Sequence, residues 1–194
     1  MNGTIPRAEE EGPLSACSAD GPRLPPVTLV LGGARSGKSR YAERLVEDAA
    51  SGGTYCATAE AGDAEMAERI AAHRARRGPF WHTVEAPLAL APAIAAHAEP
   101  ERPILVDCLT LWLSNLLLAG KQADEEPGAL CSALREAAGT VVLVSNEVGM
   151  GLVPETSLGR QFRDAAGRLN QDVAGLADRV VFVAAGLPLV LKGD

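Results

Sequence analysis

Residues 27–40, VTLVLGGARSGKSR, decide how this sequence is interpreted. The stretch begins with an apolar run at 27–31 that is typical of a buried strand. Residues 32–39 then match the pattern of Gly, four residues and Gly-Lys-Ser, whose backbone N–H groups surround the phosphates of a nucleotide. A helical pattern follows from Tyr41, so the candidate phosphate loop lies between a strand and a helix, as this chemistry requires.

Each part of the loop has a role in phosphate binding. We expect Gly32, Gly33 and Gly37 to adopt backbone angles that a side chain would block, so that N–H groups converge on phosphate oxygens. Lys38 can reach the β- and γ-phosphates, and the Ser39 hydroxyl can bind Mg²⁺. The alternative is a glycine-rich turn that fits the pattern by chance.

Composition favours one globular domain. The chain has 194 residues, of which 47% are hydrophobic. Because aromatic residues make up only 4% and the net charge is −7, we do not expect nucleic-acid binding. The longest apolar runs are too short to span a bilayer, so we do not expect insertion into a membrane. Residues 1–25 combine Gly, Pro, Ser and acidic residues without periodicity. We therefore expect a disordered tail over 1–25 and a single nucleotide-binding catalytic domain over 26–194.

The four cysteines are Cys17, Cys56, Cys108 and Cys131, and no pair has metal-binding or redox spacing. We expect reduced thiols, which are typical of a cytoplasmic protein. Cys56 and Cys108 fall in or beside apolar strands, where cysteine is a small core residue.

Apolar segments and helical patterns alternate along the chain. Strands are expected at 27–31, 54–58, 80–85, 103–107, 141–145, 179–184 and 187–191. Helices are expected from the phosphate loop to about 48 and at 64–77, 87–97, 108–118, 128–138 and 157–177. This order predicts an α/β phosphate-loop NTPase fold, a mainly parallel sheet with helices on both faces. The last two strands are too close for a helical crossover, so they should form a C-terminal antiparallel hairpin.

Asp107 ends an apolar strand at 104–107. In phosphate-loop proteins a carboxylate at this position holds Mg²⁺ directly or through water. The alternative is that Asp107 only caps the following helix.

His73 has Arg69, Arg76 and Arg77 three and four positions away, on the same side of a predicted helix. These arginines can clamp a triphosphate, and their charge disfavours the imidazolium, which leaves a nitrogen lone pair for attack on phosphorus. The alternative is a histidine beside an apolar stripe, surrounded by solvated arginines.

Residues 145–151, SNEVGMG, leave the carboxyl end of a buried strand, where open α/β sheets bind ligands. Its polar residues are candidate substrate contacts, or else part of an ordinary strand-to-loop transition.

The long helix is expected to be capped by Ser157. Its core stripe should consist of Leu158, Phe162, Ala165, Leu169 and Leu176. Another face carries Arg160, Arg163, Gly167 and Asn170, which either is solvated or lines the phosphate site.

From residue 27 onward the motifs resemble the bifunctional adenosylcobinamide kinase/adenosylcobinamide-phosphate guanylyltransferase family of cobalamin biosynthesis. The likeness begins at GGARSGKS, residues 32–39. It is densest at SNEVGMGLVPE, residues 145–155, and FRDAAGRLNQ, residues 162–171, which are far more specific than the phosphate loop.

The resemblance implies two reactions: phosphorylation of the aminopropanol hydroxyl of adenosylcobinamide, then transfer of GMP from GTP through a histidine–GMP intermediate. It implies His73 as the nucleophile, GTP and ATP as substrates, and a homotrimer. The phosphate-loop pattern itself assigns a catalytic role to Lys38 and Mg²⁺ to Ser39 and Asp107. The nucleotide contacts that the resemblance implies are Gly32, Gly33, Ala34, Arg35, Ser36, Gly37, Lys38, Ser39, Ala57, Thr58, Ala59, Arg74, Ala75, Arg76, Arg77, Glu85 and Asp107.

Two other classes compete with this function. One is a phosphate-loop GTPase or ATPase switch, which would need a base-reading motif such as Asn-Lys-x-Asp, and the sequence has none. The other is a non-catalytic nucleotide-binding regulator.

Overall fold

The computed structural model describes residues 24–60, 71, 77–121 and 125–193. Within these ranges seven strands form one sheet in the order β3-β2-β4-β5-β1-β6-β7. All neighbours are parallel except β6 and β7, which are antiparallel. The strands are β1 (Val27–Gly32), β2 (Gly53–Ala57), β3 (Trp81–Glu85), β4 (Ile104–Asp107), β5 (Val141–Asn146), β6 (Arg179–Ala184) and β7 (Leu187–Lys192).

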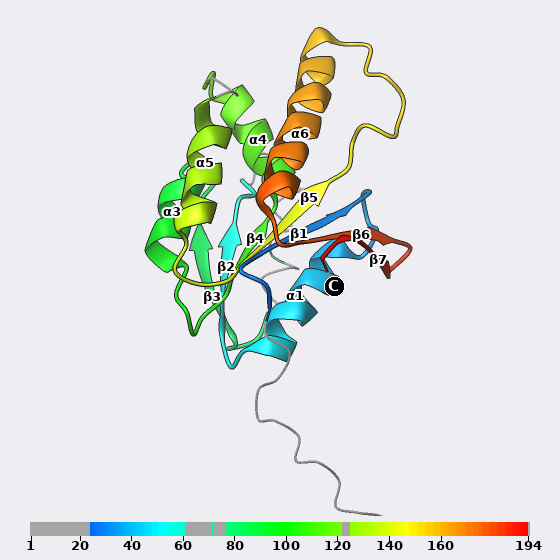
Figure 1. Cartoon of the computed structure of the whole chain (residues 1–194). Helices are drawn as coiled ribbons and strands as arrows, with labels where there is room; N and C mark the ends of the chain where they lie inside the picture. The colour runs from blue at the N-terminus through cyan, green and yellow to red at the C-terminus, as the bar shows by residue number, and fades with distance from the viewer. Residues whose placement is uncertain (1–23, 61–70, 72–76, 122–124, 194) are drawn as a thin grey trace, which may run out of the picture.

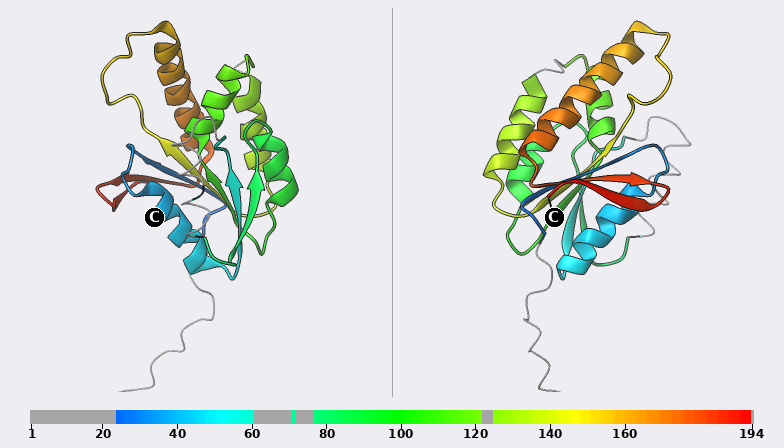
Figure 2. Two further views of the ribbon diagram at one scale, coloured as in Figure 1. Left: turned by 180° about the vertical axis from the view of Figure 1, so that it is seen from behind. Right: turned by 45° about the vertical axis from the view of Figure 1, so that its right-hand side comes forward.

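Helices cover both faces of the sheet (Figures 1 and 2). One face carries α1 (Lys38–Ala49), and the other carries α3 (Leu90–His97), α4 (Leu109–Leu118), α5 (Glu125–Glu136) and α6 (Ser157–Leu176). Alternate residues of β1 supply the two cores: Leu29 and Leu31 pack with α3–α6, and Val30 packs with α1. The predicted parallel sheet, its two helical layers and the C-terminal hairpin are therefore confirmed.

The observed boundaries of α5 differ from the predicted ones, and the residues at its N-terminus explain the difference. Helix α5 begins at Glu125 and not at 128. Glu125 and Glu126 favour a helix N-terminus, and Pro127 is tolerated in the first turn, where its missing N–H costs nothing. The predicted helix 64–77 lies outside the described residues, apart from Ala71, which is helical, and Arg77, which is not.

The start of α6 corrects the predicted cap and part of the predicted core stripe. Thr156 caps the helix, because its hydroxyl accepts a hydrogen bond of 3.1 Å from the Gly159 N–H. Leu158 is 55% exposed, since the first turns of α6 extend beyond the sheet (Figure 1). Burial starts further along, at Ala165, Ala166, Leu169, Asn170 and Val173.

The cysteines in the described part of the chain behave as core residues. Cys56, Cys108 and Cys131 are free and buried. Burial raises the pKa of Cys56 to about 12. Burial first, and then the charge of Asp107, raises the pKa of Cys108 to about 11. Both thiols are protonated at neutral pH and are poor nucleophiles.

No helix in the described ranges combines the length and apolar character needed to cross a bilayer.

The ordered domain begins slightly before the predicted boundary. Leu24 packs, partly buried, against the core on the α1 side. The Pro26 carbonyl accepts a 2.8 Å hydrogen bond from the Val141 N–H at the start of β5. Contacts to the sheet therefore exist from residue 24 onward.

We predict that deleting residues 1–23 leaves the melting temperature within about 1 °C of the full chain, because no contact described here is lost. Deleting residues 1–26 should lower it by several degrees, since the Leu24 contact and the Pro26 hydrogen bond disappear. Calorimetry of the three proteins measures this. Equal melting temperatures for the two deletions would contradict the assigned boundary.

Candidate functional site

The phosphate loop, residues 32–39, leaves the carboxyl end of β1 and enters α1. Gly37 is the N-cap residue of α1 and has a φ of 96°, in the left-handed region. Arg35 also has a positive φ, of 55°. A 3.3 Å hydrogen bond from the Ser36 N–H to the Gly33 carbonyl and a 3.0 Å bond from the Tyr41 N–H to the Gly37 carbonyl fix the loop at both ends. This geometry directs the N-terminus of α1 toward the space above the loop, where an anion is favoured.

The three glycines of the loop are constrained for different reasons. The expectation that all three need backbone angles that a side chain would block is therefore wrong. Only Gly37 has a positive φ. At Gly32 the constraint is space, because a Cβ would lie 2.5 Å from the Val183 carbonyl oxygen. A Cβ on Gly33 would meet nothing within 4 Å.

The turn between β6 and β7 supports the loop from the side. The Gly186 N–H donates a 2.8 Å hydrogen bond to the Ser36 carbonyl. A Cβ on Gly37 would lie 3.3 Å from the Gly186 Cα. Loop and hairpin are therefore packed backbone to backbone, which explains why the C-terminal strands belong to the site.

Lys38 lies in the first turn of α1 and is 8% exposed. Its ammonium group donates a 3.1 Å hydrogen bond to the Gly33 carbonyl, which holds the charge across the loop. Lys38 also acts electrostatically on Cys108, the residue after Asp107. Ser39, the next residue of α1, is half-buried.

Asp107 ends β4 and is oriented by Tyr55 of β2. The Tyr55 hydroxyl donates a 2.8 Å hydrogen bond to Oδ2 of Asp107. Burial, followed by the charge of Asp107, raises the pKa of Tyr55 well above its ordinary value, so the phenol stays a neutral donor. The Arg77 guanidinium carbon lies 3.6 Å from the centroid of the Tyr55 ring, in a cation–π contact.

Asp107 does not cap the following helix. The N-cap residue of α4 is Cys108, and no side chain makes a capping hydrogen bond there. The helix-cap alternative for Asp107 is therefore wrong, and its carboxylate faces Tyr55.

A carboxylate and a hydroxyl are the oxygen ligands that Mg²⁺ prefers, and Mg²⁺ usually takes few protein ligands in nucleotide sites. The described residues contain no group of three or more His, Cys, Asp or Glu side chains that could hold a metal by themselves. Asp107 and Ser39 therefore fit a metal that is shared with nucleotide phosphates and do not fit a closed protein cage.

The side chain of Thr58 has a structural role, because it links β2 to the backbone that follows β4. The residue is completely buried, and its hydroxyl exchanges hydrogen bonds of 2.7 and 2.8 Å with the backbone of Cys108. Asn115 of α4 donates a 2.8 Å bond to the Thr58 carbonyl. The hydroxyl, the N–H and the carbonyl of Thr58 are therefore all engaged within the scaffold.

The predicted site residues that the structure describes lie along one edge of the sheet. Ala57 is in register with Glu85 on one side and with Asp107 on the other. At about 4.8 Å per strand, Glu85 and Asp107 are roughly 10 Å apart in the backbone. Their strands end on the same edge as β1 and its loop (Figure 1). Four predicted site residues lie outside the described ranges, namely His73, Arg74, Ala75 and Arg76.

The guanidinium groups of Arg160 and Arg163 find their partners among residues close to them in the sequence. Arg160 donates to the carbonyl oxygens of Pro154 and Glu155, at 3.0 and 2.7 Å. Arg163 pairs with Asp164 at 3.3 Å. Both arginines thus follow the solvated-face alternative. Asn170, predicted on the same face, is instead buried at 6% exposure.

Comparison with known proteins identifies the family. The model of the family described as cobinamide kinase / cobinamide phosphate guanyltransferase matches residues 28–191. A bifunctional adenosylcobalamin biosynthesis protein, CobP, from Pseudomonas aeruginosa is 54% identical over 168 residues, which cover 86% of this chain and 97% of that protein. The corresponding protein CobU from Salmonella typhimurium is 42% identical over 179 residues, covering 84% and 98%. The chain belongs to this family.

Solved structures with low sequence identity resemble this protein as well, and they bear only on its fold. The ATPase EscN of the enteropathogenic E. coli type III secretion system superposes with a TM-score of 0.55 at 12% identity, covering 83% of this chain and 43% of EscN. A second type III secretion ATPase gives a TM-score of 0.54, also at 12% identity, covering 84% and 56%. Both support the phosphate-loop NTPase class, as does the sheet order.

Sequence reasoning missed the residues that hold the site in shape. Tyr55 is one, although a tyrosine within an apolar strand normally finds a partner for its hydroxyl, and that signal was available. Thr110 is another: its hydroxyl accepts a 2.7 Å bond from the Asn146 N–H and lies 3.3 Å from the Ser145 hydroxyl. No local pattern predicts that second contact, because β5 and α4 meet only in the folded sheet.

We predict that Gly37→Ala lowers the melting temperature of the family member by about 2–8 °C. A left-handed residue with a Cβ costs about 1–2 kcal/mol, and each kcal/mol shifts a domain of this size by about 2–4 °C. Gly33→Ala is the matched control and should shift it by less than about 1 °C, since its Cβ meets nothing. Calorimetry distinguishes them; equal shifts would refute this account of the loop.

Proposed function

We propose that this protein is an enzyme with two activities. It phosphorylates the aminopropanol hydroxyl of adenosylcobinamide with ATP or GTP. It then transfers GMP from GTP to the resulting adenosylcobinamide phosphate through a histidine–GMP intermediate, which gives adenosyl-GDP-cobinamide and pyrophosphate. The observation that carries this proposal is the 54% identity to a bifunctional relative across 97% of that relative's length, combined with an intact phosphate loop.

In the kinase step the loop holds the β- and γ-phosphates through its backbone N–H groups and through Lys38. The acceptor oxygen forms a bond to the γ-phosphorus, and the bond from that phosphorus to the β–γ bridging oxygen breaks. Positioning and neutralisation of charge supply most of such catalysis, so the buried cation of Lys38 is the main protein contribution. When bound at Ser39 and Asp107, Mg²⁺ supplies further neutralisation of the phosphate charge.

In the guanylyl step a nitrogen of His73 attacks the α-phosphorus of GTP. An N–P bond forms, the bond to the α–β bridging oxygen breaks, and pyrophosphate leaves. A phosphate oxygen of the acceptor then attacks the same phosphorus, the N–P bond breaks, and the imidazole is released. Arg69, Arg76 and Arg77 are assigned to neutralising the leaving group.

The described residues on either side of His73 support this assignment. Thr58, before the segment, is tied to Asp107 and Cys108. Arg77, after it, contacts the ring of Tyr55, whose hydroxyl binds Asp107. Four residues span at most about 14 Å, so covalent connectivity alone keeps His73 in the neighbourhood of the site.

The remaining nucleotide contacts are proposed on the same edge of the sheet. They are residues 32–39 for the phosphates, with Ala57, Thr58, Ala59, Arg74, Ala75, Arg76, Arg77, Glu85 and Asp107 around the rest of GTP. The hydroxyl and both backbone polar groups of Thr58 are already hydrogen-bonded, so we assign it to holding Asp107 and Cys108 in place beside the nucleotide.

We further propose a homotrimer in the cytoplasm, with a single catalytic domain that begins at residue 24 and a dispensable tail at 1–23. Support for self-association comes from β7, an edge strand with exposed Leu187, Leu189, Val190 and Leu191. Support for a reducing compartment comes from the free thiols.

Incubation of the purified protein with GTP and Mg²⁺ separates the proposal from its alternatives. A guanylyltransferase releases pyrophosphate and labels itself, a GTPase switch yields GDP and phosphate, and a regulator yields neither. Phosphorylation of adenosylcobinamide by ATP or GTP tests the kinase independently.

We predict that Lys38→Ala reduces both activities by at least about 10²-fold, because the phosphates lose their buried counter-charge. Lys121→Ala, at an exposed lysine paired with Glu126, is the control and should leave both rates unchanged. Steady-state assays with each nucleotide measure this. Near-normal turnover by Lys38→Ala would remove the phosphate loop from the mechanism.

We predict that His73→Asn abolishes covalent labelling by α-labelled GTP and retains the kinase activity. In the native protein the label should be acid-labile and base-stable, as expected of an imidazole–phosphorus bond. His82→Asn, at an exposed histidine of β3, is the matched control and should label fully. Full labelling of His73→Asn, or label mapped to His82, would assign the nucleophile elsewhere.

A further inference from the structure

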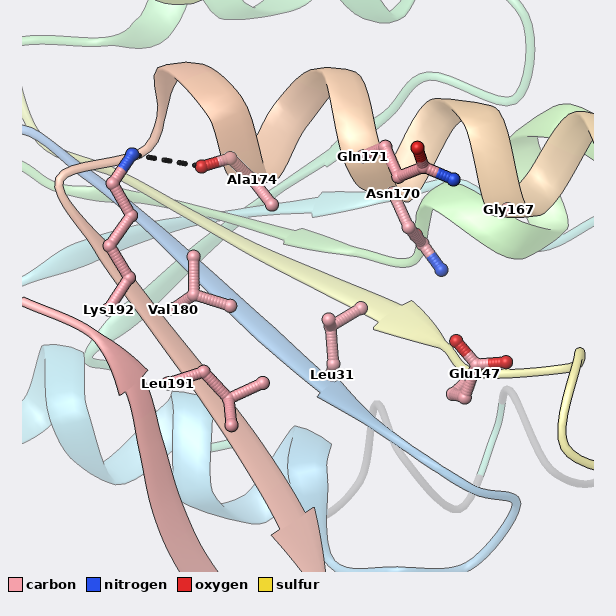
Figure 3. Close-up of a pocket in the computed structure, with 9 residues that line it drawn as sticks. All are labelled: Leu31, Glu147, Gly167, Asn170, Gln171, Ala174, Val180, Leu191 and Lys192. Carbon is pink, nitrogen blue, oxygen red and sulfur yellow. Dashed lines mark hydrogen bonds between the residues drawn. The ribbon is translucent and has the colours of Figure 1, made fainter.

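A cavity of about 510 Å³ lies on the α6 side of the sheet, next to the phosphate loop but on the opposite face from α1. Its lining comes from α6, the ends of β1 and β5, and the C-terminal hairpin (Figure 3). Leu31, Ala174 and Val180 make an apolar floor and wall. Glu147 and Asn170 supply polar groups toward the end near the loop, and Lys192 lies at the opposite end (Figure 3).

Glu147 connects this cavity to the phosphate loop. Its N–H donates a 3.1 Å hydrogen bond to the carbonyl of Gly32, the first residue of the loop. The next loop residue, Gly33, holds the Lys38 ammonium. The Glu147 carboxylate is oriented by a 2.5 Å bond from the Gly149 N–H. The carboxylate is therefore fixed just past the carboxyl end of β5 (Figure 3). The loop to which the Glu147 backbone is bonded is the one that we expect to hold the terminal phosphate of a donor.

Asn170 gives this end of the cavity unused hydrogen-bonding capacity. Its side chain is only 6% exposed, and its amide nitrogen donates a 3.2 Å bond to the Asn146 carbonyl. Its Oδ1 is buried, and within the described ranges it has no hydrogen-bond partner; the same holds for Oδ1 of Asn146. Unsatisfied buried acceptors cost about 1–3 kcal/mol each, so a hydroxyl donor entering here gains more than it would in water.

We propose that this cavity binds the acceptor alcohol of the kinase reaction, with Glu147 as the general base. The inference rests on the proposed kinase function and adds the acceptor site. An aliphatic alcohol fits the lining, because its carbon arm meets Leu31, Ala174 and Val180 while its hydroxyl meets Glu147 and Asn170. As the acceptor oxygen bonds to the γ-phosphorus, its proton passes to the Glu147 carboxylate and the bond to the β–γ bridging oxygen breaks.

Under this assignment the kinase step uses residues on the α6 side of the phosphate loop, and the guanylyl step uses residues on the β2 and β4 side. A donor held by the loop and α1 leaves the α6 face of the same edge open to an acceptor. Asp107, Tyr55 and Arg77 lie on the β2 and β4 side, where the segment carrying His73 attaches. Loss of Glu147 should therefore affect phosphorylation and spare guanylyl transfer.

Glu147→Gln tests the base, because the amide keeps the size but cannot take the proton. We expect kcat of the kinase reaction to fall by about 10²–10⁴-fold. Pyrophosphate release with GTP and acceptor that is already phosphorylated should stay within about threefold of the native rate. Glu136→Gln, at an exposed residue that ends α5, is the control for both assays. Kinase activity retained by Glu147→Gln, or equal loss of both activities, would overturn the assignment.

Gly167→Leu tests the cavity. A Cβ at Gly167 meets nothing within 4 Å and projects from α6 at the cavity lining. Replacing a helical glycine should also stabilise the helix by up to about 1 kcal/mol. We expect KM for the alcohol to rise at least tenfold with an unchanged Kd for the nucleotide. Gly175→Leu, equally unobstructed on α6 but outside the lining, is the control. An unchanged KM in Gly167→Leu, or a change of oligomeric mass in place of a KM effect, would overturn the acceptor site.

Failure of the proposed function has a separate signature. If the native protein phosphorylates no alcohol, the kinase proposal itself fails before any variant is compared. If the native protein is active and both variants behave like their controls, only the acceptor site fails.

Discussion

Everything at the site depends on how closely the backbone packs at the carboxyl end of β1. This strand pairs with β5 on one side and β6 on the other, so three chain segments leave the sheet at almost the same point. At Gly32 they are so close that an added Cβ would lie only 2.5 Å from the Val183 carbonyl oxygen. Backbone hydrogen bonds thereby link Glu147 to the loop at Gly32 and the β6–β7 turn to the loop at Ser36. Positioning of this kind resists substitution of side chains but is sensitive to a single methyl group.

The second organising feature is electrostatic. Lys38 and Asp107 bring opposite charges into a partly buried region, where their effect on phosphate and metal is less screened than in water. Tyr55 keeps the carboxylate oriented and stays neutral because ionising a buried phenol beside a carboxylate is costly. Arg77, stacked on the same ring, couples the geometry of this carboxylate to the chain segment that carries His73.

The sequence predicts the architecture well because the relevant signals are local. Strand composition, short connections and the loop pattern were sufficient for the parallel sheet, its two helical layers and the C-terminal hairpin. The errors concern contacts between distant segments. Gly32 is constrained by Val183 of another strand and not by its own backbone angle. Leu158 has the correct helical spacing, yet the sheet does not extend far enough to cover it. Tyr55 and Asp107 are 52 residues apart, and only folding reveals that they are partners.

The support that the β6–β7 turn gives to the phosphate loop also bears on how the chain is made. β1 is synthesised early, but both of its neighbours in the sheet, β5 and β6, follow much later. The Gly186 N–H that fixes Ser36 belongs to a turn that is synthesised far downstream of the loop. A growing polypeptide therefore cannot complete its nucleotide site until the β6–β7 turn has left the ribosome's tunnel. Such long-range closure slows folding, and it also means that a truncated translation product lacks a finished loop with which to sequester nucleotide.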